Sequence, residues 1–475
     1  MTEPSPIRGL YIDGEWRETG VLDMRTDRWN GDTLSELQLS GAQEARLAVD
    51  AAAGAFSTGL SVADRSRILA RVAAAITERS DEFAEAIQRE TGKPISAARV
   101  EVARAAGTLA YAGEEARRLP GERVPLDAVD AGEGTLAVTI PTARGVVAAI
   151  TPFNFPLNLV AHKVGPALAA GCPVVLKPSD KAPLAAILLV EAFESAGLPA
   201  GWLNLVHGPA EPIVDSWLDD DRVAVINFTG SAKIGWQLKA RSPRKMHILE
   251  LGSNSAMYVC ADADLDRAVD DAVVAGFANS GQACISLQRL YLDVAIAEDF
   301  LARLSVKVSG IPFGDPLDES TIVGPLVIDE AAVRVGELID AAVGAGARLL
   351  VAGARTGSVV APTLLADVSD DDRVMRDELF GPVVAAATVT DRDDAVSRIN
   401  DSQYGLNTSI YTREIAAALD FAGRIRSGSV LVNMPPSFRA DHMPYGGVKD
   451  SGQGREGVRY AVAELVDMKL VVIKG

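Results

Sequence analysis

Short apolar runs that alternate with amphipathic segments constrain the fold of this chain more than any other feature of its sequence. From Gly145 onward, the runs GVVAAIT, PVVLKPS, LNLVHG, RVAVINFTG and MHILELG are separated by helical segments such as PLAAILLVEAFESAG. Strands that alternate with helices form right-handed βαβ units, and hence a parallel sheet covered by helices. A second series of this kind begins after Leu251 and continues to about Asn433. The pattern predicts two α/β domains within the 475 residues.

The segments outside these two series have other patterns. Helical periodicity dominates residues 41–118, after a hairpin-like stretch, GLYIDGEWRE, near the start. A Pro-Gly break at residues 120–121 precedes GTLAVTIPTARG, which predicts one or two strands, and the chain ends in LVDMKLVVIKG. We expect these two leftover β segments to pair with each other or with a neighbouring subunit.

Composition excludes several classes of partner. Lys and Arg number 46 against 64 Asp and Glu, a formal net charge of −18. With no basic block, neither nucleic acid nor an anionic membrane is an expected partner. The first residues carry acids and no apolar core of a secretory signal, and no apolar run approaches the ~20 residues of a membrane span. Three cysteines, none in a C-x-x-C pair, predict no disulfide framework and no structural metal. A cytoplasmic location follows as the simplest expectation.

One of the three thiols has a context suited to chemistry. Cys284 lies in NSGQACI, a glycine-bearing turn directly after a helical segment. A reactive thiol needs backbone N–H groups, access and a lowered pKa, and such a turn supplies them more readily than a packed strand. Cys172 and Cys260 lie in apolar strand contexts, which indicates inert core residues.

Two further polar residues follow predicted strands. Glu250 ends the apolar run KMHILELG, where the carboxyl end of a parallel strand faces the ligand crevice of an open sheet. It is either a general base or a solvated edge carboxylate. Asn154, in TPFNFP, lies just past another strand. Its amide is either an oxyanion donor or a turn residue.

Two segments have the features of a nucleotide site. Lys177, Ser179 and Asp180 follow the strand PVVL, where a lysine and an acid can both reach a ribose. The segment FTGSAKIG, residues 228–235, follows the strand AVIN and opens a helix, whose backbone N–H groups can meet a pyrophosphate. A literal G-x-G-x-x-G at residues 452–457 follows no apolar strand, so we reject it as a dinucleotide fingerprint.

Together these segments resemble the NAD(P)-dependent aldehyde dehydrogenase superfamily over nearly the whole chain. The family's Asn, Glu and Cys signature reappears in order at Asn154, Glu250 and Cys284, and the last two are 34 residues apart, as in hydrolytic members. The segment DELFGP, residues 377–382, resembles the family's E-E-x-F-G-P, and YGL, SVLVN and PYGGVKDSGQGREG complete the series. Where the family commonly has a second glycine after E-L-G, this chain has Ser253, beside the expected nicotinamide approach.

The resemblance implies a three-part α/β fold. A Rossmann-like coenzyme domain would take residues 1–120 and 144–249, a catalytic α/β domain residues 250–450, and a small β arm for oligomerisation residues 121–143 and 451–475. The family assembles as dimers and tetramers, so we expect a homodimer or homotetramer.

The resemblance also implies the roles of individual residues. Cys284 attacks the aldehyde carbonyl, Asn154 and the Cys284 N–H hold the oxyanion, and Glu250 activates the water that hydrolyses the thioester. The expected cofactor residues are Thr151, Pro152, Phe153, Lys177, Ser179, Asp180, Gly230, Ser231, Gly235, Leu251, Glu378 and Phe380.

The substrate expected from the sequence is a small polar aldehyde, neutral or anionic. Positions that line the substrate mouth in the family correspond here to His162, Arg439 and Phe155, and a charge in an apolar mouth costs desolvation unless a polar substrate compensates. The stretch RADHMP resembles both phosphonoacetaldehyde and non-phosphorylating glyceraldehyde-3-phosphate dehydrogenases, which take anions, and lactaldehyde dehydrogenases, which do not. The alternative is that Arg439 pairs with Asp441 and faces solvent.

The cofactor preference and two other functions stay open at this point. Asp180 would accept hydrogen bonds from the adenine ribose and repel a 2′-phosphate, which favours NAD, while Lys177 and Ser179 are compatible with NADP. The alternatives are a catalytically silent NAD-binding structural homologue and an acylating enzyme that transfers the product to coenzyme A. The intact catalytic set argues against the first, and Glu250 argues against the second.

Overall fold

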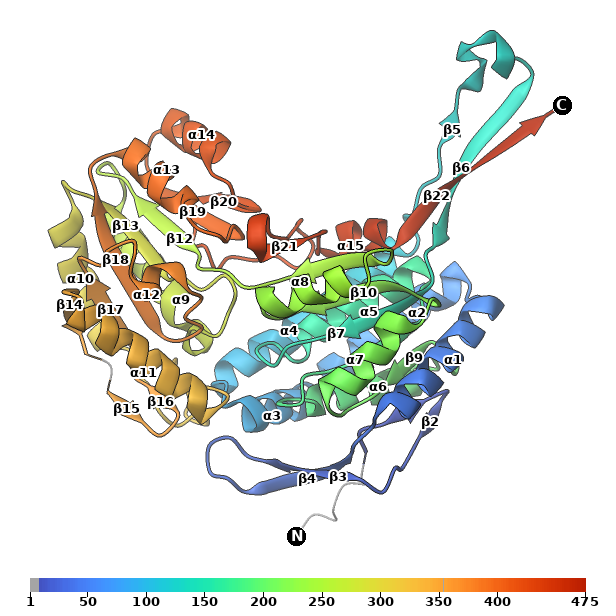
Figure 1. Ribbon diagram of the computed structural model, residues 1–475, viewed down its shortest axis with the longest axis horizontal. Helices are drawn as coiled ribbons and strands as arrows, with labels where there is room; N and C mark the ends of the chain where they lie inside the picture. The colour runs from blue at the N-terminus through green and yellow to red at the C-terminus, as the bar shows by residue number, and fades with distance from the viewer. Residues whose placement is uncertain (1–7, 353) are drawn as a thin grey trace.

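A computed structural model describes residues 8–352 and 354–475 of the chain. Figure 1 shows two α/β bodies side by side and a long β arm that projects from one of them. Residues 1–7 lie outside the described residues. They belong to the predicted coenzyme domain and to the segment in which we expect no secretory signal.

The first body is built on an eight-stranded sheet with the order β2-β1-β9-β8-β7-β10-β11-β21. Its five central strands are parallel. Strands β7 and β8 are buried at every position, as expected where helices cover both faces of a sheet. The predicted N-terminal hairpin is confirmed as the edge pair β1 and β2. The strands are β1 (Tyr11–Ile12), β2 (Glu15–Trp16), β7 (Val146–Ile150), β8 (Val174–Lys177), β9 (Leu203–Leu205), β10 (Val223–Thr229), β11 (Met246–Glu250) and β21 (Gly452–Gln453).

Helices cover this sheet on both faces (Figure 1). Residues 41–118 contain four of them, as the periodicity predicts. The helix α5 is buried at every position, because its sequence is apolar around most of its circumference and it packs between the sheet and α4. The helices are α1 (Ala42–Thr58), α2 (Val62–Glu78), α3 (Ser80–Thr91), α4 (Ile95–Glu115), α5 (Asn158–Ala170), α6 (Leu184–Ser195), α7 (Ala210–Asp219), α8 (Ala232–Arg241) and α15 (Val458–Glu464).

The second body contains a seven-stranded sheet with the order β14-β17-β18-β13-β12-β19-β20, parallel except for the edge strand β14. Its strands are β12 (Ala256–Val259), β13 (Arg289–Asp293), β14 (Arg348–Val351), β17 (Thr363–Ala366), β18 (Val383–Val389), β19 (Asn407–Tyr411) and β20 (Ser429–Val432). Its helices are α9 (Leu265–Phe277), α10 (Ala297–Ser309), α11 (Asp329–Gly344), α12 (Arg373–Arg376), α13 (Arg392–Asn400) and α14 (Ile415–Arg424). Two short hairpins complete the fold, β3 (Leu22–Thr26) with β4 (Thr33–Gln38) and β15 (Arg355–Thr356) with β16 (Val359–Val360).

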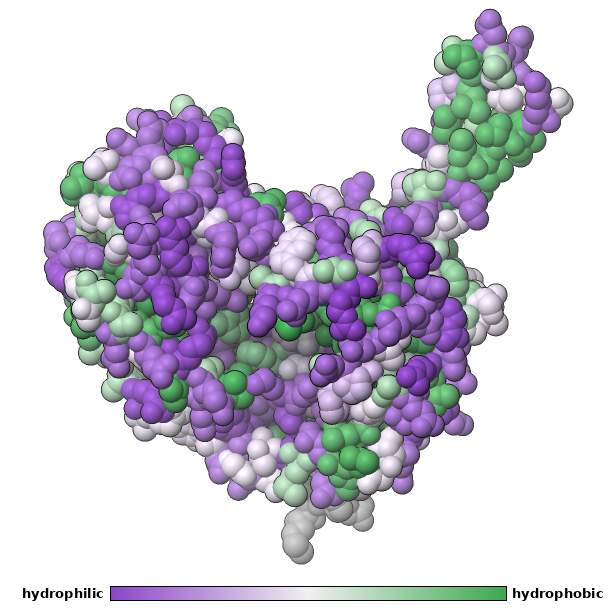
Figure 2. Space-filling view, viewed as in Figure 1, coloured by the Kyte–Doolittle hydropathy of each residue, from purple (hydrophilic) through white to green (hydrophobic). Residues whose placement is uncertain are grey.

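The arm confirms that the two leftover β segments pair. The strand β6 (Thr135–Ala143) is a single strand, and it pairs antiparallel over its whole length with β22 (Val466–Lys474), while β5 (Arg123–Val124) pairs with its other edge. Apolar side chains are exposed along the arm, and Figure 2 shows them gathered there: Leu136, Ile140, Met468, Leu470, Val472 and Ile473. A sheet of three strands cannot bury both of its faces, so these side chains stay in contact with solvent within one chain.

The segment 451–465 differs from our assignment of it to the arm. Its strand β21 pairs with β11 in the large sheet, and its helix α15 packs against α5 and α4. Only the residues from Val466 onward enter the arm, because Val458 and Val462 are buried in the core of the first body. The other domain limits stay a prediction.

Candidate active site

A cavity of about 530 Å³ brings together residues from both bodies. It opens at the carboxyl ends of β7, β10 and β11, and β7 and β10 are the neighbours at which the strand order of the first sheet reverses. That position is where open parallel sheets bind ligands. Of the residues predicted from the sequence, those that line it are Pro152, Phe153, Asn154, Phe155, Gly230, Ser231, Glu250, Leu251, Cys284, Glu378, Phe380 and Arg439.

A strained loop presents Cys284 to the cavity. After α9, a short 3₁₀-helix (Ala278–Gly281) holds Asn279, Ser280 and Gly281 at φ values of 52°, 57° and 70°. Three successive left-handed residues cost conformational energy, and the surrounding structure must hold them in place. A Cβ on Gly281 would collide with the carbonyl oxygen of Gly381, so the third position requires glycine. The predicted glycine-bearing turn is therefore a tightly specified one.

The Cys284 thiol contacts a residue that the sequence reasoning did not single out. Its Sγ lies 3.0 Å from the hydroxyl oxygen of Tyr445, and the guanidinium carbon of Arg439 lies 3.8 Å from the centre of the Tyr445 ring. Burial, helped by nearby Glu250 and Glu378, raises the pKa of the Cys284 thiol to about 11, against the lowering effects of Tyr445 and Arg439. The expectation of a lowered pKa at this turn is thus wrong for the protein alone, chiefly because burial opposes the thiolate and secondarily because two carboxyl groups lie nearby.

Glu250 is buried with no partner for its carboxyl group. It is 4% exposed, and neither of its carboxyl oxygens accepts or donates a hydrogen bond within the described chain. Burial raises its pKa well above the ordinary value, and the neighbouring Glu456 raises it further. The alternative of a solvated edge carboxylate is wrong. A perturbed carboxyl group on a cavity wall is a candidate for acid–base chemistry.

Asn154 is held in place through both its side chain and its backbone. Its Nδ2 donates to the carbonyl oxygen of Gln282 at 2.9 Å, two residues before Cys284. Its carbonyl oxygen accepts a hydrogen bond from Lys93 Nζ at 2.8 Å. Lys93 is buried in an ion pair with Glu101, whose other oxygen accepts the backbone N–H of Leu157 at 2.9 Å. This buried pair therefore fixes the path of the chain from Asn154 to Leu157.

The crevice at the ends of β7 and β10 has the features that a dinucleotide requires. The hydroxyl groups of Thr151 and Thr229 are buried there without hydrogen-bond partners. Gly230 and Ser231 follow β10, and Ser231 caps α8 through the N–H of Ile234. The N-terminus of a helix offers its N–H groups to an anion. These orphaned hydroxyls and the open N-terminus of α8 fit an NAD(P) molecule, which the resemblance implies.

The Glu378 carboxyl group closes the crevice from the second body. It accepts the backbone N–H of Ser253 at 3.0 Å, and a Cβ on Gly252 would lie 2.6 Å from its Oε2. Burial raises its pKa to about 7. Phe380 meets Phe153 edge to face, with ring centres 5.9 Å apart, across the cavity. The Ser253 hydroxyl lies 3.4 Å from that of Ser255 and outside the cavity lining.

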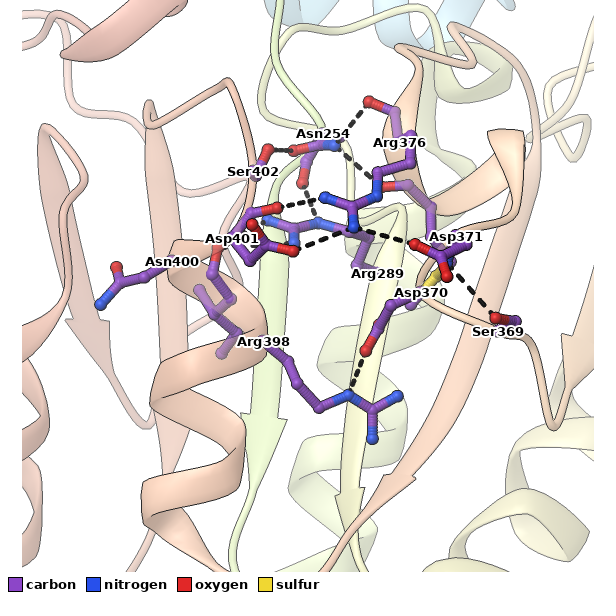
Figure 3. Close-up of polar contacts among 12 residues, drawn as sticks. Asn254, Arg289, Ser369, Asp370, Asp371, Arg376, Arg398, Asn400, Asp401 and Ser402 are labelled. Atoms are coloured by element: carbon purple, nitrogen blue, oxygen red, sulfur yellow. Dashed lines mark hydrogen bonds and ion pairs between the residues drawn. The ribbon is translucent and has the colours of Figure 1, made fainter.

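A polar network fixes the link between the two sheets (Figure 3). Asn254 accepts a hydrogen bond from the Ser402 hydroxyl at 2.8 Å and donates to the carbonyl oxygens of Met375 and Arg376 at 3.0 and 3.2 Å. Arg376 in turn donates to Asp401. The link after β11 is thereby tied to the segment that carries Glu378.

Six predicted site residues do not line the cavity. Lys177 pairs with Asp180 at 2.5 Å, while Ser179 accepts the N–H of Lys181. A Cβ on Gly235 would collide with Leu251, so this glycine serves the close packing of α8 on β11. The other two are Thr151 and His162.

His162 lies behind the cavity wall rather than on it. It is fully buried, and its Nε2 lies 2.9 Å from Asp441, which also accepts hydrogen bonds from Arg104 and Asn158. His162 lies on α5, which is buried at every position, so its ring does not reach the cavity as the predicted substrate contact would require. Burial lowers the pKa of His162, and Arg439 lowers it further.

Arg439 lies on the cavity wall, and the alternative in which it pairs with Asp441 and faces solvent is wrong. Its side chain is 7% exposed, and its Nη2 donates to Glu456 at 2.9 Å. Glu456 also accepts from the buried Lys163 at 3.1 Å. Burial opposes ionisation of Glu456, but Lys163 and Arg439 outweigh it and hold its pKa at about 2. The Nε of Arg439 has no hydrogen-bond partner among residues 8–352 and 354–475.

The sequence reasoning missed the charged groups that support the site. Lys93, Glu101, Lys163 and Glu456 are buried charges, and residue type alone does not distinguish a buried charge from a surface one. Tyr445 and Glu456 lie in the quoted motif PYGGVKDSGQGREG, but their contacts join residues up to 293 positions apart. Cys172 and Cys260 are buried, as predicted.

Within residues 8–352 and 354–475, no group of three or more His, Cys, Asp or Glu is placed to hold a metal ion. No helix in the same ranges is both long and apolar enough to cross a bilayer.

Glu101→Gln should lower the free energy of unfolding by about 3–5 kcal/mol, because it leaves the charge of Lys93 buried without a counterion. Glu114→Gln is the matched control on the same helix, since Glu114 forms a surface pair with Arg118 that is worth about 0–1 kcal/mol. Urea denaturation of the two variants measures the difference. Equal effects would mean that the Lys93–Glu101 pair does not support the fold around Asn154.

Comparison with known proteins agrees with this site. The chain matches the model of the aldehyde dehydrogenase family over residues 19–471. It is 40% identical to a 3-sulfolactaldehyde dehydrogenase of Priestia aryabhattai over the full length of both, and 35% identical to a lactaldehyde dehydrogenase of Methanococcus aeolicus over 98% of this chain and 99% of that one. The structure of an NADP-dependent glyceraldehyde-3-phosphate dehydrogenase from Bacillus halodurans, complexed with NADP, superposes with a TM-score of 0.96 at 31% identity and covers 98% of this chain and 99% of its own. The resemblance and fold inferred from the sequence are confirmed: this chain belongs to the aldehyde dehydrogenase family and is an NAD(P)-dependent oxidoreductase.

Proposed function

We propose that this enzyme oxidises a short anionic aldehyde of the 3-sulfolactaldehyde type to its carboxylic acid, with NAD as the preferred cofactor. The anionic substrate class is inferred from Arg439. Its side chain is buried on the wall of the Cys284 cavity, and its Nε has no hydrogen-bond partner among the described residues. The runner-up is lactaldehyde, the substrate named for a relative of 35% identity.

The charges around Arg439 support an anionic substrate. Three cations, Lys163, Arg104 and Arg439, accompany two carboxylates, Glu456 and Asp441, on this side of the cavity. His162 and Arg104 hold the pKa of Asp441 below its usual range against the effect of burial, and Glu250 is held toward its neutral form. These three cations and two carboxylates together carry one positive charge beside the cavity. A sulfonate, phosphate or carboxylate on the substrate would neutralise it.

In the proposed reaction, the Cys284 thiolate adds to the aldehyde carbon, and the electron pair of the carbonyl moves to its oxygen. The second N–H of Asn154 Nδ2 and the backbone N–H of Cys284 are the proposed donors to that oxyanion. Bound NAD supplies the hydride acceptor, so the aldehyde carbon becomes a thioester on Cys284. Glu250, after losing its own proton to solvent, then takes a proton from water, which displaces the thiolate and releases the acid.

This assignment favours hydrolysis over transfer to coenzyme A, because Glu250 provides the base for water. Acid formation in the absence of coenzyme A would therefore be expected. The exposed apolar face of the arm supports a homodimer or homotetramer, since such a face is normally covered. Three free cysteines are consistent with a reducing compartment such as the cytoplasm.

Arg439→Leu should lower kcat/KM for 3-sulfolactaldehyde by about 10- to 150-fold relative to lactaldehyde, because it removes a charge-assisted contact worth about 1.5–3 kcal/mol. Glu456 keeps Lys163 as its partner in the variant. The ratio of the two kcat/KM values is the quantity to measure, since any change in thiol reactivity or folding affects both substrates alike. An unchanged ratio would favour the lactaldehyde-type substrate instead.

The cofactor preference rests on the ion pair of Asp180 with the buried Lys177. Because Asp180 already pairs with the Lys177 ammonium group, that lysine is not free to bind the 2′-phosphate of NADP, and the Asp180 carboxylate would repel it. NAD should give a kcat/KM at least tenfold above that for NADP, and Asp180→Ser should shift this ratio toward NADP. A wild-type enzyme that prefers NADP would contradict this part of the proposal.

A further inference from the structure

Tyr445 is held beside Cys284 from two sides. Its backbone N–H and carbonyl oxygen pair with those of Glu456, at 3.0 and 2.6 Å, in an isolated antiparallel bridge. The Glu456 carboxylate fixes Arg439, and the Arg439 guanidinium lies over the Tyr445 ring, 3.8 Å from its centre. Ile285 and Leu406 pack against Tyr445 in a small apolar cluster. The hydroxyl group is therefore aimed by a rigid frame.

The Cys284 sulfur is the only hydrogen-bond partner of the Tyr445 hydroxyl among the residues that the structure describes, at 3.0 Å. We propose that Tyr445 is a catalytic residue of this enzyme that donates its hydroxyl proton as a hydrogen bond to the Cys284 thiolate, and that Arg439, which lies over the ring, strengthens this bond. The inference rests on the proposed role of Cys284 as nucleophile.

The charges around the thiol make such a donor necessary. The side chains that shift its pKa most are Glu250 from the end of β11, Glu378 from the segment before β18, and Arg439 and Tyr445 from the loop after β20. Burial and the two carboxyl groups oppose ionisation of the thiol, while Arg439 and the Tyr445 hydrogen bond favour it. Burial also raises the pKa of Tyr445 well above 10, so the phenol keeps its proton.

The ionisation step balances without any further reactant. The Sγ–H bond breaks, its electron pair stays on sulfur, and the proton leaves to solvent. Tyr445 does not transfer its own proton; its O–H group turns toward the sulfur, which is then the better acceptor. A cation above an aromatic ring stabilises electron density on that ring, and for a phenol it also makes the hydroxyl a stronger donor. The same arginine would thus serve both the substrate anion and the nucleophile.

The test is the alkylation rate of Cys284 by iodoacetamide, measured by peptide mass from pH 6 to 9.5 on the full-length enzyme with and without NAD. In this range the rate follows the thiolate fraction. Tyr445→Phe keeps the ring, its packing and its position under Arg439, and removes only the hydroxyl. We expect alkylation of Cys284 to slow about tenfold at each pH, which corresponds to a rise of about one unit in its pKa.

Tyr411→Phe is the matched control, because Tyr411 is equally buried and its hydroxyl donates to Asp271 at 2.7 Å in the second sheet. It should leave the rate unchanged. Cys172 and Cys260 serve as internal references for folding, since both are buried and should stay unlabelled in every variant. Arg439→Gln, which keeps the Tyr445 hydroxyl, should slow alkylation about threefold.

An unchanged or faster alkylation rate in Tyr445→Phe would overturn the proposal. It would mean that the Tyr445 hydroxyl either does not change the pKa of Cys284 or raises it. If that variant fails to fold, an unchanged rate in Arg439→Gln would overturn it as well. These readings need no substrate. They therefore stay distinct from a failure of the proposed function, which appears as absent aldehyde oxidation with normal thiol reactivity.

Discussion

The site depends on one fully buried carboxylate, Glu456. It accepts hydrogen bonds from Lys163 on α5 and from Arg439 on the loop before it, so two cations from different elements meet at one anion. Removing Glu456 would leave two buried cations without their shared anion, which makes this carboxylate hard to replace. From this ion cluster the geometry extends to Tyr445, to the thiol of Cys284, and to Glu250, whose ionisation Glu456 opposes.

The two doubly wound sheets supply the frame around this cluster. Strand order reverses between β7 and β10, and the segments after those strands carry Asn154 and Gly230 into the same crevice. The second sheet delivers Cys284 between α9 and β13, and Glu378 between α12 and β18. The link through Asn254 then fixes how the Glu378 segment meets the end of β11. Because the reacting groups come from the ends of rigid elements, their separations depend little on any flexible loop.

Much of this was predictable from the sequence, for physical reasons that differ between features. The βαβ order follows from hydrophobic periodicity, which is local. The pairing of β6 with β22 was one of two outcomes expected for the leftover β segments. The positions of Asn154, Glu250 and Cys284 follow from their places at strand and helix ends, and all three line one cavity. The segment 451–465 was misassigned because a two-residue strand and a seven-residue helix carry little periodic signal.

The buried charges were not predictable in the same way. Nothing in the local sequence separates Lys93 or Lys163 from a surface lysine, and the partners of Glu456 and Asp441 are set only by the tertiary fold. The pKa of Cys284 depends on Glu250 and Glu378, which lie 34 and 94 residues away along the chain. The prediction of a lowered pKa at that turn considered only the backbone around the thiol and therefore missed both carboxyl groups.

The account centres on a thioester on Cys284 that Glu250 resolves with water. The most direct measurement is rapid-mixing kinetics of Glu250→Gln with 3-sulfolactaldehyde and NAD, followed by acid quenching and peptide mass analysis. The account predicts a burst of one NADH per active site, a much slower steady rate, and an acyl group on the peptide that contains Cys284. Loss of both the burst and the adduct in a folded variant would show that Glu250 acts before the thioester forms, and would contradict the account.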